Sequence, residues 1–154
     1  MESTYLIGPL PTHLYAVSGI EAVRVSVSEM ENGAADFGMS AREMMLFVQG
    51  MLRLAGVPVV GNAAAEEAPV LHATVGVRQV VDLYTVTLSV ELWDRVWLTR
   101  QTDGSALHAA TWRRQAALVS NRHELRNNTR LELGNLMAAF VNDYIAANRP
   151  RASA

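Results

Sequence analysis

Two tryptophans and the arginine between them are the side chains in this sequence best suited to form a binding site. Trp93, Arg95 and Trp97 alternate along a run with an extended pattern, so all three should point to one face of a β-strand. Thr87 and Glu91 have the same parity and lengthen that face. Large aromatic side chains beside arginine on an exposed surface are typical of protein-binding hot spots. We therefore predict a recognition or self-association surface; the alternative is that the N-terminal segment or a homodimer partner covers the indoles.

A second set of side chains could bind anions. All thirteen basic residues are arginines, and residues 95–130 hold seven of them against two acids. A guanidinium group can contact phosphate or carboxylate through two hydrogen bonds. The candidate anion patch consists of Arg113, Arg114, Arg122, Arg126 and Arg130. The plainer interpretation is a bias toward arginine with ordinary solvent contacts on a helix. A net charge of −2 also gives no general attraction to nucleic acid, which is therefore an unfavoured partner.

No catalytic motif is recognisable in the chain. It has no cysteine, which excludes disulfides, thiolate metal sites and cysteine nucleophiles. Its four histidines are scattered singly, no serine lies in a nucleophile elbow, and no glycine-rich loop resembles a phosphate cradle. We predict a non-enzymatic protein without catalytic residues, metal or cofactor. The alternative is a small-ligand-binding or enzymatic domain with a pocket beside the polar, alanine-rich loop 61–69.

The strands that must position these side chains follow from the hydrophobic pattern. Residues 83–100 and 106–119 are two extended runs around the turn signal of residues 102–105, which predicts an antiparallel hairpin. Residues 21–29 and 70–77 alternate similarly and should form two further strands. In the first arm of the hairpin, we assign Tyr84, Val86, Leu88, Val90 and Leu92 to the core. The alternation of the second arm does not decide which face Trp112 joins.

Two helices should cover one side of these strands. Ser40 and Glu43 have the spacing of a capping box, apolar residues at helical spacing follow, and Gly56 ends the helix. Asn121 and Glu124 repeat the capping pattern before a long closing helix that ends at Pro150. The expected apolar stripe of this closing helix is Leu125, Thr129, Leu133, Leu136, Met137, Phe140, Val141 and Tyr144.

The order strand, helix, three antiparallel strands, helix predicts an α+β fold. We expect a two-layer sandwich in which two helices lie on one face of a mostly antiparallel sheet of about four strands, with the other face open. The first strand and helix should cross over in the right-handed sense, whereas the strand order beyond the hairpin stays undetermined. Residues 1–20 are predicted as an extended lead-in, 21–149 as a single domain and 150–154 as a frayed tail.

The 154 residues contain no stretch long and apolar enough to span a membrane, and the opening residues lack a positively charged region before an apolar core. We expect a soluble protein, cytoplasmic if Met1 is the true start and periplasmic if a leader was removed.

Several stretches resemble a group of uncharacterised bacterial proteins over roughly residues 20–148. These stretches are VRVSVSE, LAGVPVV, VTLSVELWDRVWLTR, ATW and FVNDYIAAN. The order of strands and helices is in turn similar to accessory domains of the bacterial cell envelope, namely the amino-terminal domain type of TolB and the lipoprotein activators of penicillin-binding proteins. The resemblance implies a non-catalytic accessory module that binds a protein partner or itself, in the cell envelope, and it supplies no site residues.

Overall fold

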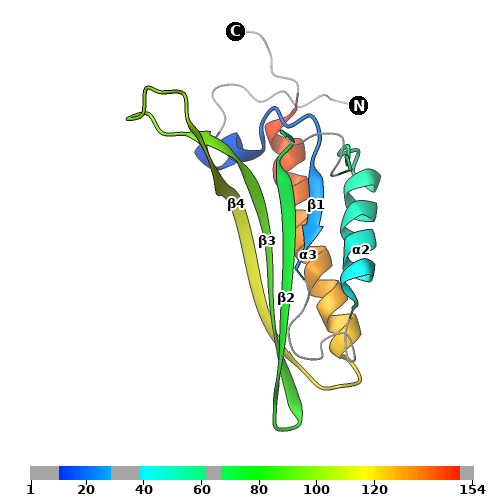
Figure 1. Ribbon diagram of the computed structural model, residues 1–154. Coiled ribbons are helices and arrows are strands. Elements are labelled where there is room, and N and C mark those ends of the chain that lie inside the picture. The colour runs from blue at the N-terminus through cyan, green and yellow to red at the C-terminus, as the bar shows by residue number, and fades with distance from the viewer. Residues whose placement is uncertain (1–10, 29–38, 62–66, 150–154) are drawn as a thin grey trace.

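A four-stranded sheet with two α-helices on one face forms the part of the chain that a computed structural model describes, residues 11–28, 39–61 and 67–149 (Figure 1). The elements are the short 3-10 helix η1 (Thr12–Val17), β1 (Arg24–Val27), α2 (Ala41–Leu54), β2 (Val70–Val80), β3 (Leu83–Trp97), β4 (Ala106–Ser120) and α3 (Leu125–Ala147). This arrangement confirms the predicted α+β sandwich. The predicted tail 150–154 and most of loop 61–69 lie outside the described residues.

The strand order in the sheet is β1-β2-β3-β4. β1 pairs with β2 in the parallel sense, and the crossover between them contains α2, as expected for a parallel pair. The other neighbours are antiparallel, and β2 and β3 form a hairpin that the sequence pattern did not define. β1 covers less than the expected 21–29, although Val23 extends the edge through a bridge to Val59.

The core lies between the sheet and the helices. The five residues assigned to the inner face of the first hairpin arm, Tyr84, Val86, Leu88, Val90 and Leu92, are all buried. Against them pack buried residues of α2 and α3, among them Met44, Val48, Leu52, Leu133, Met137 and Phe140. Of the predicted α3 stripe, Val141 and Tyr144 are only partly buried, and all the others are buried.

A side chain caps the start of α2, whereas side-chain hydrogen bonds shape the turn that precedes α3. The Ser40 hydroxyl accepts a hydrogen bond from the Glu43 amide at 3.1 Å, which satisfies a donor that the first helical turn leaves unpaired. Asn121 accepts a hydrogen bond from the Glu124 amide at 2.9 Å and donates one to the Glu124 carboxylate at 3.1 Å. Residues 122–124 form a turn, so α3 itself begins at Leu125, later than the sequence predicted.

The prediction of an extended lead-in over residues 1–20 is wrong for part of that segment. Thr12–Val17 form a 3-10 helix because Leu14 and Val17, three residues apart, both enter the core. The Asn148 side chain donates to the Val17 carbonyl at 2.9 Å and accepts from the Gly19 amide at 2.8 Å, which ties the segment to the end of α3. Residues 12–19 are therefore attached to the helix layer, whereas β1 belongs to the sheet.

Candidate functional site

The predicted recognition residues do lie together on the sheet face that the helices leave uncovered. β3 remains regular from Leu83 to Trp97, so its alternate side chains stay on one face, as the sequence pattern indicated. The exposed fractions are 38% for Trp93 and 60% for Trp97. Thr87, nearer the β2–β3 turn, is also exposed. The two indoles are therefore available to a partner.

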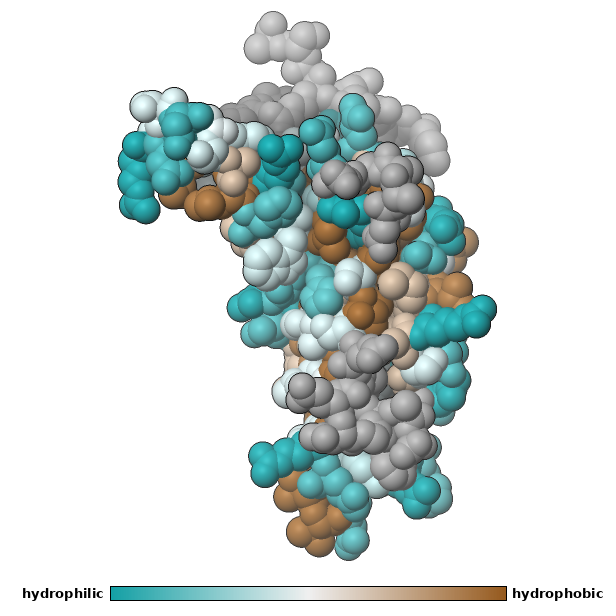
Figure 2. Space-filling model, viewed as in Figure 1, coloured by the Kyte–Doolittle hydropathy of each residue, from teal (hydrophilic) through white to brown (hydrophobic). Residues whose placement is uncertain are grey.

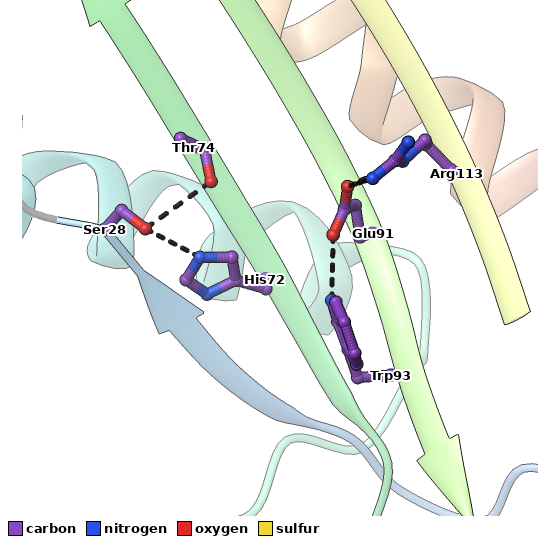
Figure 3. Close-up of polar contacts among 6 residues, drawn as sticks. All are labelled: Ser28, His72, Thr74, Glu91, Trp93 and Arg113. Atoms are coloured by element: carbon purple, nitrogen blue, oxygen red, sulfur yellow. Dashed lines mark hydrogen bonds and ion pairs between the residues drawn. The ribbon is translucent and has the colours of Figure 1, made fainter. Parts of the chain in front are cut away.

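Glu91 is the centre of the polar contacts on this face (Figure 3). Its carboxylate accepts a hydrogen bond from the indole Nε1 of Trp93 at 2.8 Å and one from Nε of Arg113 at 2.6 Å. Arg113 also forms an ion pair with the same carboxylate through its terminal nitrogen. Glu91 is only 9% exposed, so these charge-assisted bonds compensate for the loss of its solvation. They hold the Trp93 ring in one orientation.

Trp97 is positioned by contacts with its neighbour Arg95. The guanidinium carbon of Arg95 lies 5.8 Å from the centre of the Trp97 ring, within the range of a cation–π contact. The same guanidinium is 3.5 Å from the Glu67 carboxylate, at the start of the segment leading into β2. Asp94 accepts a hydrogen bond from the Arg95 amide at 2.8 Å. Arg95 thus places a positive charge over the face of the Trp97 indole.

His72 continues this polar row toward β1, which the sequence pattern did not reveal. It pairs with Glu91 in the sheet register, and Glu91 pairs with Arg113. The Nε2 atom of His72 is 2.7 Å from the Ser28 hydroxyl, which is also 3.5 Å from the Thr74 hydroxyl (Figure 3). Histidine, glutamate and arginine on three adjacent strands give this part of the face both signs of charge.

A shallow hollow of about 410 Å³ occupies the middle of the open face. It is lined by the small and polar residues Thr74, Thr87, Ser89, Gln115 and Ala117, together with Leu88 and Ala116. Gly76 deepens this region, since a Cβ atom there would come within 2.8 Å of the Thr87 hydroxyl oxygen. None of its lining residues belongs to loop 61–69, beside which the sequence suggested a pocket as the alternative site; most of that loop lies outside the described residues.

Trp112, whose face the sequence left open, belongs to the helix side of the sheet. It is 5% exposed, and its ring meets the Phe140 ring edge-on at a centroid distance of 5.1 Å. Its indole Nε1 donates to the Asp143 carboxylate at 2.9 Å. Trp112 is therefore part of the core and joins α3 to β4.

The five arginines of the candidate anion patch do not form one surface. Arg113 reaches Glu91 on the open face, whereas Arg114 reaches Asp143 at 3.6 Å on the helix face. The remaining three belong to α3 and the turn before it. Arg126 pairs with Glu43 at 2.6 Å, Arg130 lies 5.3 Å over the Phe47 ring, and Arg122 lies in the turn. The arginines mainly connect elements to one another.

Nothing in the described part of the chain forms a group of three or more histidine, aspartate or glutamate side chains able to hold a metal ion. The helices of this part are also too short or too polar to cross a membrane.

Comparison with known proteins relates the chain to no family. No protein-family model and no curated protein sequence matches it. Among solved structures, a PelC dodecamer from Paraburkholderia phytofirmans is similar over 94% of this chain and 96% of its own, with 15% identity and a TM-score of 0.38. A dodecamer of a PelC point variant from the same organism is similar over 87% of this chain and 91% of its own, with 15% identity and a TM-score of 0.40. At these scores the similarity carries no argument about what this chain binds or how it assembles.

Proposed function

We propose that this protein is a non-catalytic interaction module that binds a protein partner through the open sheet face around Trp93, Arg95 and Trp97. The observation that carries the proposal is the exposure of two indoles: Trp93, which a hydrogen bond to Glu91 orients, and Trp97, whose ring lies against Arg95. The resemblance of the sequence to cell-envelope accessory domains adds the expectation that the partner is a bacterial envelope protein.

Preorganisation is the physical reason why these indoles suit binding. A side chain that must be immobilised on association reduces affinity by its lost rotamer freedom. Trp93 is held by its hydrogen bond to Glu91, and Trp97 by Arg95. A partner that buries them would therefore gain a large apolar area at a small entropic cost.

The charges around the indoles support selectivity. Glu91 and Arg113 form an ion pair on this face and neutralise each other. The ion pair between Arg95 and Glu67 is longer, at 3.5 Å, and 41% of the Arg95 side chain is exposed. Arg95 can therefore exchange this contact for a carboxylate of the partner. Such charged contacts at a rim mainly set orientation and association rate, whereas burial of the aromatic rings supplies the affinity.

The proposal is tested with Trp97→Ala, Trp93→Ala and a control, Leu54→Ala, which removes a side chain 90% exposed at the end of α2. Tagged wild-type and variant chains are used to capture partners from bacterial lysate, and a captured protein is then purified for titration. We expect the Trp97 variant to raise the Kd about 30-fold or more, the effect of losing a hot-spot side chain. The Leu54 variant should bind as the wild type does.

Circular dichroism separates binding from folding. Both tryptophan variants should keep the wild-type spectrum, because the two indoles lie outside the core. Unfolding of both variants, or equal affinity of all variants for the purified partner, would overturn the proposal. Light scattering and acrylamide quenching of the free protein decide a further point: a dimer with protected indoles would make a second copy the partner of this face.

A further inference from the structure

The turn between β2 and β3 exposes an apolar tip, formed by Val80, Val81 and Leu83. Their exposed fractions are 48%, 82% and 49%. Val80 and Leu83 form the last pair of the β2–β3 ladder, so Val81 and Asp82 make up the two-residue turn. The hairpin projects past the helices at the foot of the molecule, where Figure 2 shows an apolar end (Figures 1 and 2). This tip is at the far end of β3 from Trp93 and Trp97.

The backbone conformation of Val81 is unfavourable for valine, and burial of its side chain within the described chain does not compensate for it. Val81 has a φ of 56°, in the left-handed region where a β-branched residue is strained. Two-residue hairpin turns usually place glycine or asparagine at positions of positive φ. The side chain of Val81 is exposed, so burial within the chain does not offset the strain. A contact with another molecule would give this valine a favourable role.

An apolar groove lies between α2 and α3 on the opposite layer of the fold. Phe47, Met51 and Leu131 line its apolar part, and its volume is about 390 Å³. Gly134 forms part of the lining, where the Phe47 ring comes within 3.6 Å of the position of a Cβ atom. Leu131 is 66% exposed, which leaves an apolar surface on the groove as well as on the tip.

The charges at the tip and at the groove are complementary. Asp82 lies in the tip between the apolar side chains, and Arg130 lies over the Phe47 ring in the groove. Neither takes part in an ion pair among the salt bridges of the described residues, whereas Arg126, one turn earlier, is paired with Glu43. An aspartate flanked by aliphatic side chains thus matches an arginine flanked by apolar ones.

We propose that the tip of one copy of this chain inserts into the α2–α3 groove of a second copy, with Asp82 of the tip facing Arg130 of the groove. The two surfaces are different, so the contact is head-to-tail. Each copy can bind a neighbour through its tip and bind another neighbour's tip in its groove. Such contacts continue into a ring if the rotation closes and into a chain if it does not. The indole face takes no part and stays available to another protein.

Analytical ultracentrifugation of the full chain over a concentration series tests this contact. Val81→Gly removes the side chain and relieves the positive φ, so we expect self-association to weaken at least tenfold while Tm stays equal or rises. Val119→Ala is the control, because Val119 is 62% exposed on the open face and belongs to neither surface. This control should associate as the wild type does.

Charge exchange gives a second, independent test. Asp82→Arg and Arg130→Asp should each weaken self-association, and the double variant should recover it because the ion pair is restored with the charges reversed. Recovery in the double variant also shows that the Arg130 substitution leaves the helices folded. A wild-type chain that is monomeric at every concentration would overturn the inference. It would equally be overturned if association persisted in Val81→Gly, or if it were lost with Trp97→Ala instead.

Discussion

Replacing Arg113 with alanine should reduce the free energy of unfolding more than replacing Glu91 with glutamine. The Glu91 side chain is 11% exposed and that of Arg113 is 55% exposed, so the carboxylate depends on its partner and the guanidinium does not. Without Arg113, the carboxylate keeps its bond from the Trp93 indole but stays poorly solvated. An unsatisfied buried polar group costs about 1–3 kcal/mol, and water can enter the space that Arg113 vacates, so we expect a loss of about 1–2 kcal/mol.

Glutamine at position 91 removes the charge and keeps the shape. Its carbonyl oxygen can still accept the Trp93 hydrogen bond, and its NH2 group then faces the Arg113 donor. Because Arg113 is 55% exposed, its guanidinium can turn to water, so the loss should be about 0.5–1 kcal/mol. In the double variant no charge is buried, and removing Arg113 should cost little beyond the effect of Glu91→Gln. The double-mutant cycle should therefore give a coupling free energy close to the whole Arg113→Ala loss, about 1–2 kcal/mol, between positions 91 and 113.

Urea unfolding followed by circular dichroism measures these differences. The slope of the free energy of unfolding against urea concentration should be equal in all variants, which would show that only stability has changed. Arg100→Ala is the matched control, since Arg100 is an exposed arginine beyond the end of β3, and its loss should stay within about 0.5 kcal/mol. Equal stability of Arg113→Ala and the wild type, or strict additivity in the double variant, would refute the assignment of Glu91 as the charge that organises this face.

Two further predictions concern single polar groups. The Thr129 hydroxyl is buried in α3 without a hydrogen-bond partner in the described part of the chain, so Thr129→Val should leave stability unchanged or raise it by about 1 kcal/mol; a clear fall in Tm would contradict this. Hydrogen bonding from the Ser105 amide holds the pKa of Asp103 below its usual 3.8. Because the folded-state pKa of Asp103 is lower than its unfolded-state pKa, ionised Asp103 stabilises the fold at pH values above the unfolded-state pKa. This stabilisation is lost as the pH falls through the folded-state pKa. An NMR titration of Asp103 with a midpoint at or above 3.8 would refute the prediction.

Sequence reasoning predicted the side-chain faces of β3 because the strand has no irregularity. Its apolar residues from Tyr84 to Leu92 enter the core, and Trp93 and Trp97 stay on the opposite face. A period of two residues decides the face of every side chain once one of them is placed. The start of α2 was predictable for a similar reason, because the bond between Ser40 and Glu43 is local.

Contacts between distant segments were not predictable from the pattern. The parallel pairing of β1 with β2 depends on the crossover through α2, and the alternation of either strand is the same for a parallel or an antiparallel neighbour. The ion pairs of the arginines were missed for this reason too. The i, i+4, i+8 spacing of Arg122, Arg126 and Arg130 predicts one side of a helix, but α3 begins only at Leu125. The spacing also does not show that Glu43 and Phe47 of α2 lie against Arg126 and Arg130.

The second hairpin arm was ambiguous because it contains a bulge. Counting back from the turn pairs Trp93 with Ala110 and would next pair Leu92 with Thr111, but the register shifts and Leu92 pairs with Trp112. Thr111 is the extra residue in β4, and its hydroxyl donates to the Leu92 carbonyl at 3.3 Å. One inserted residue reverses the faces of all side chains beyond it.

This bulge also builds the candidate site. Without it, the register would place Glu91 opposite Trp112 and leave Arg113 opposite an inward-facing residue. With it, Arg113 lies opposite Glu91 and can neutralise the carboxylate that holds the Trp93 indole. Because the extra residue is in β4, the alternation of β3 continues unbroken and both indoles remain on the open face. Deleting Thr111 should remove the bulge but keep Arg113 opposite Glu91, because Trp112 would then follow Ala110 directly and still pair with Leu92.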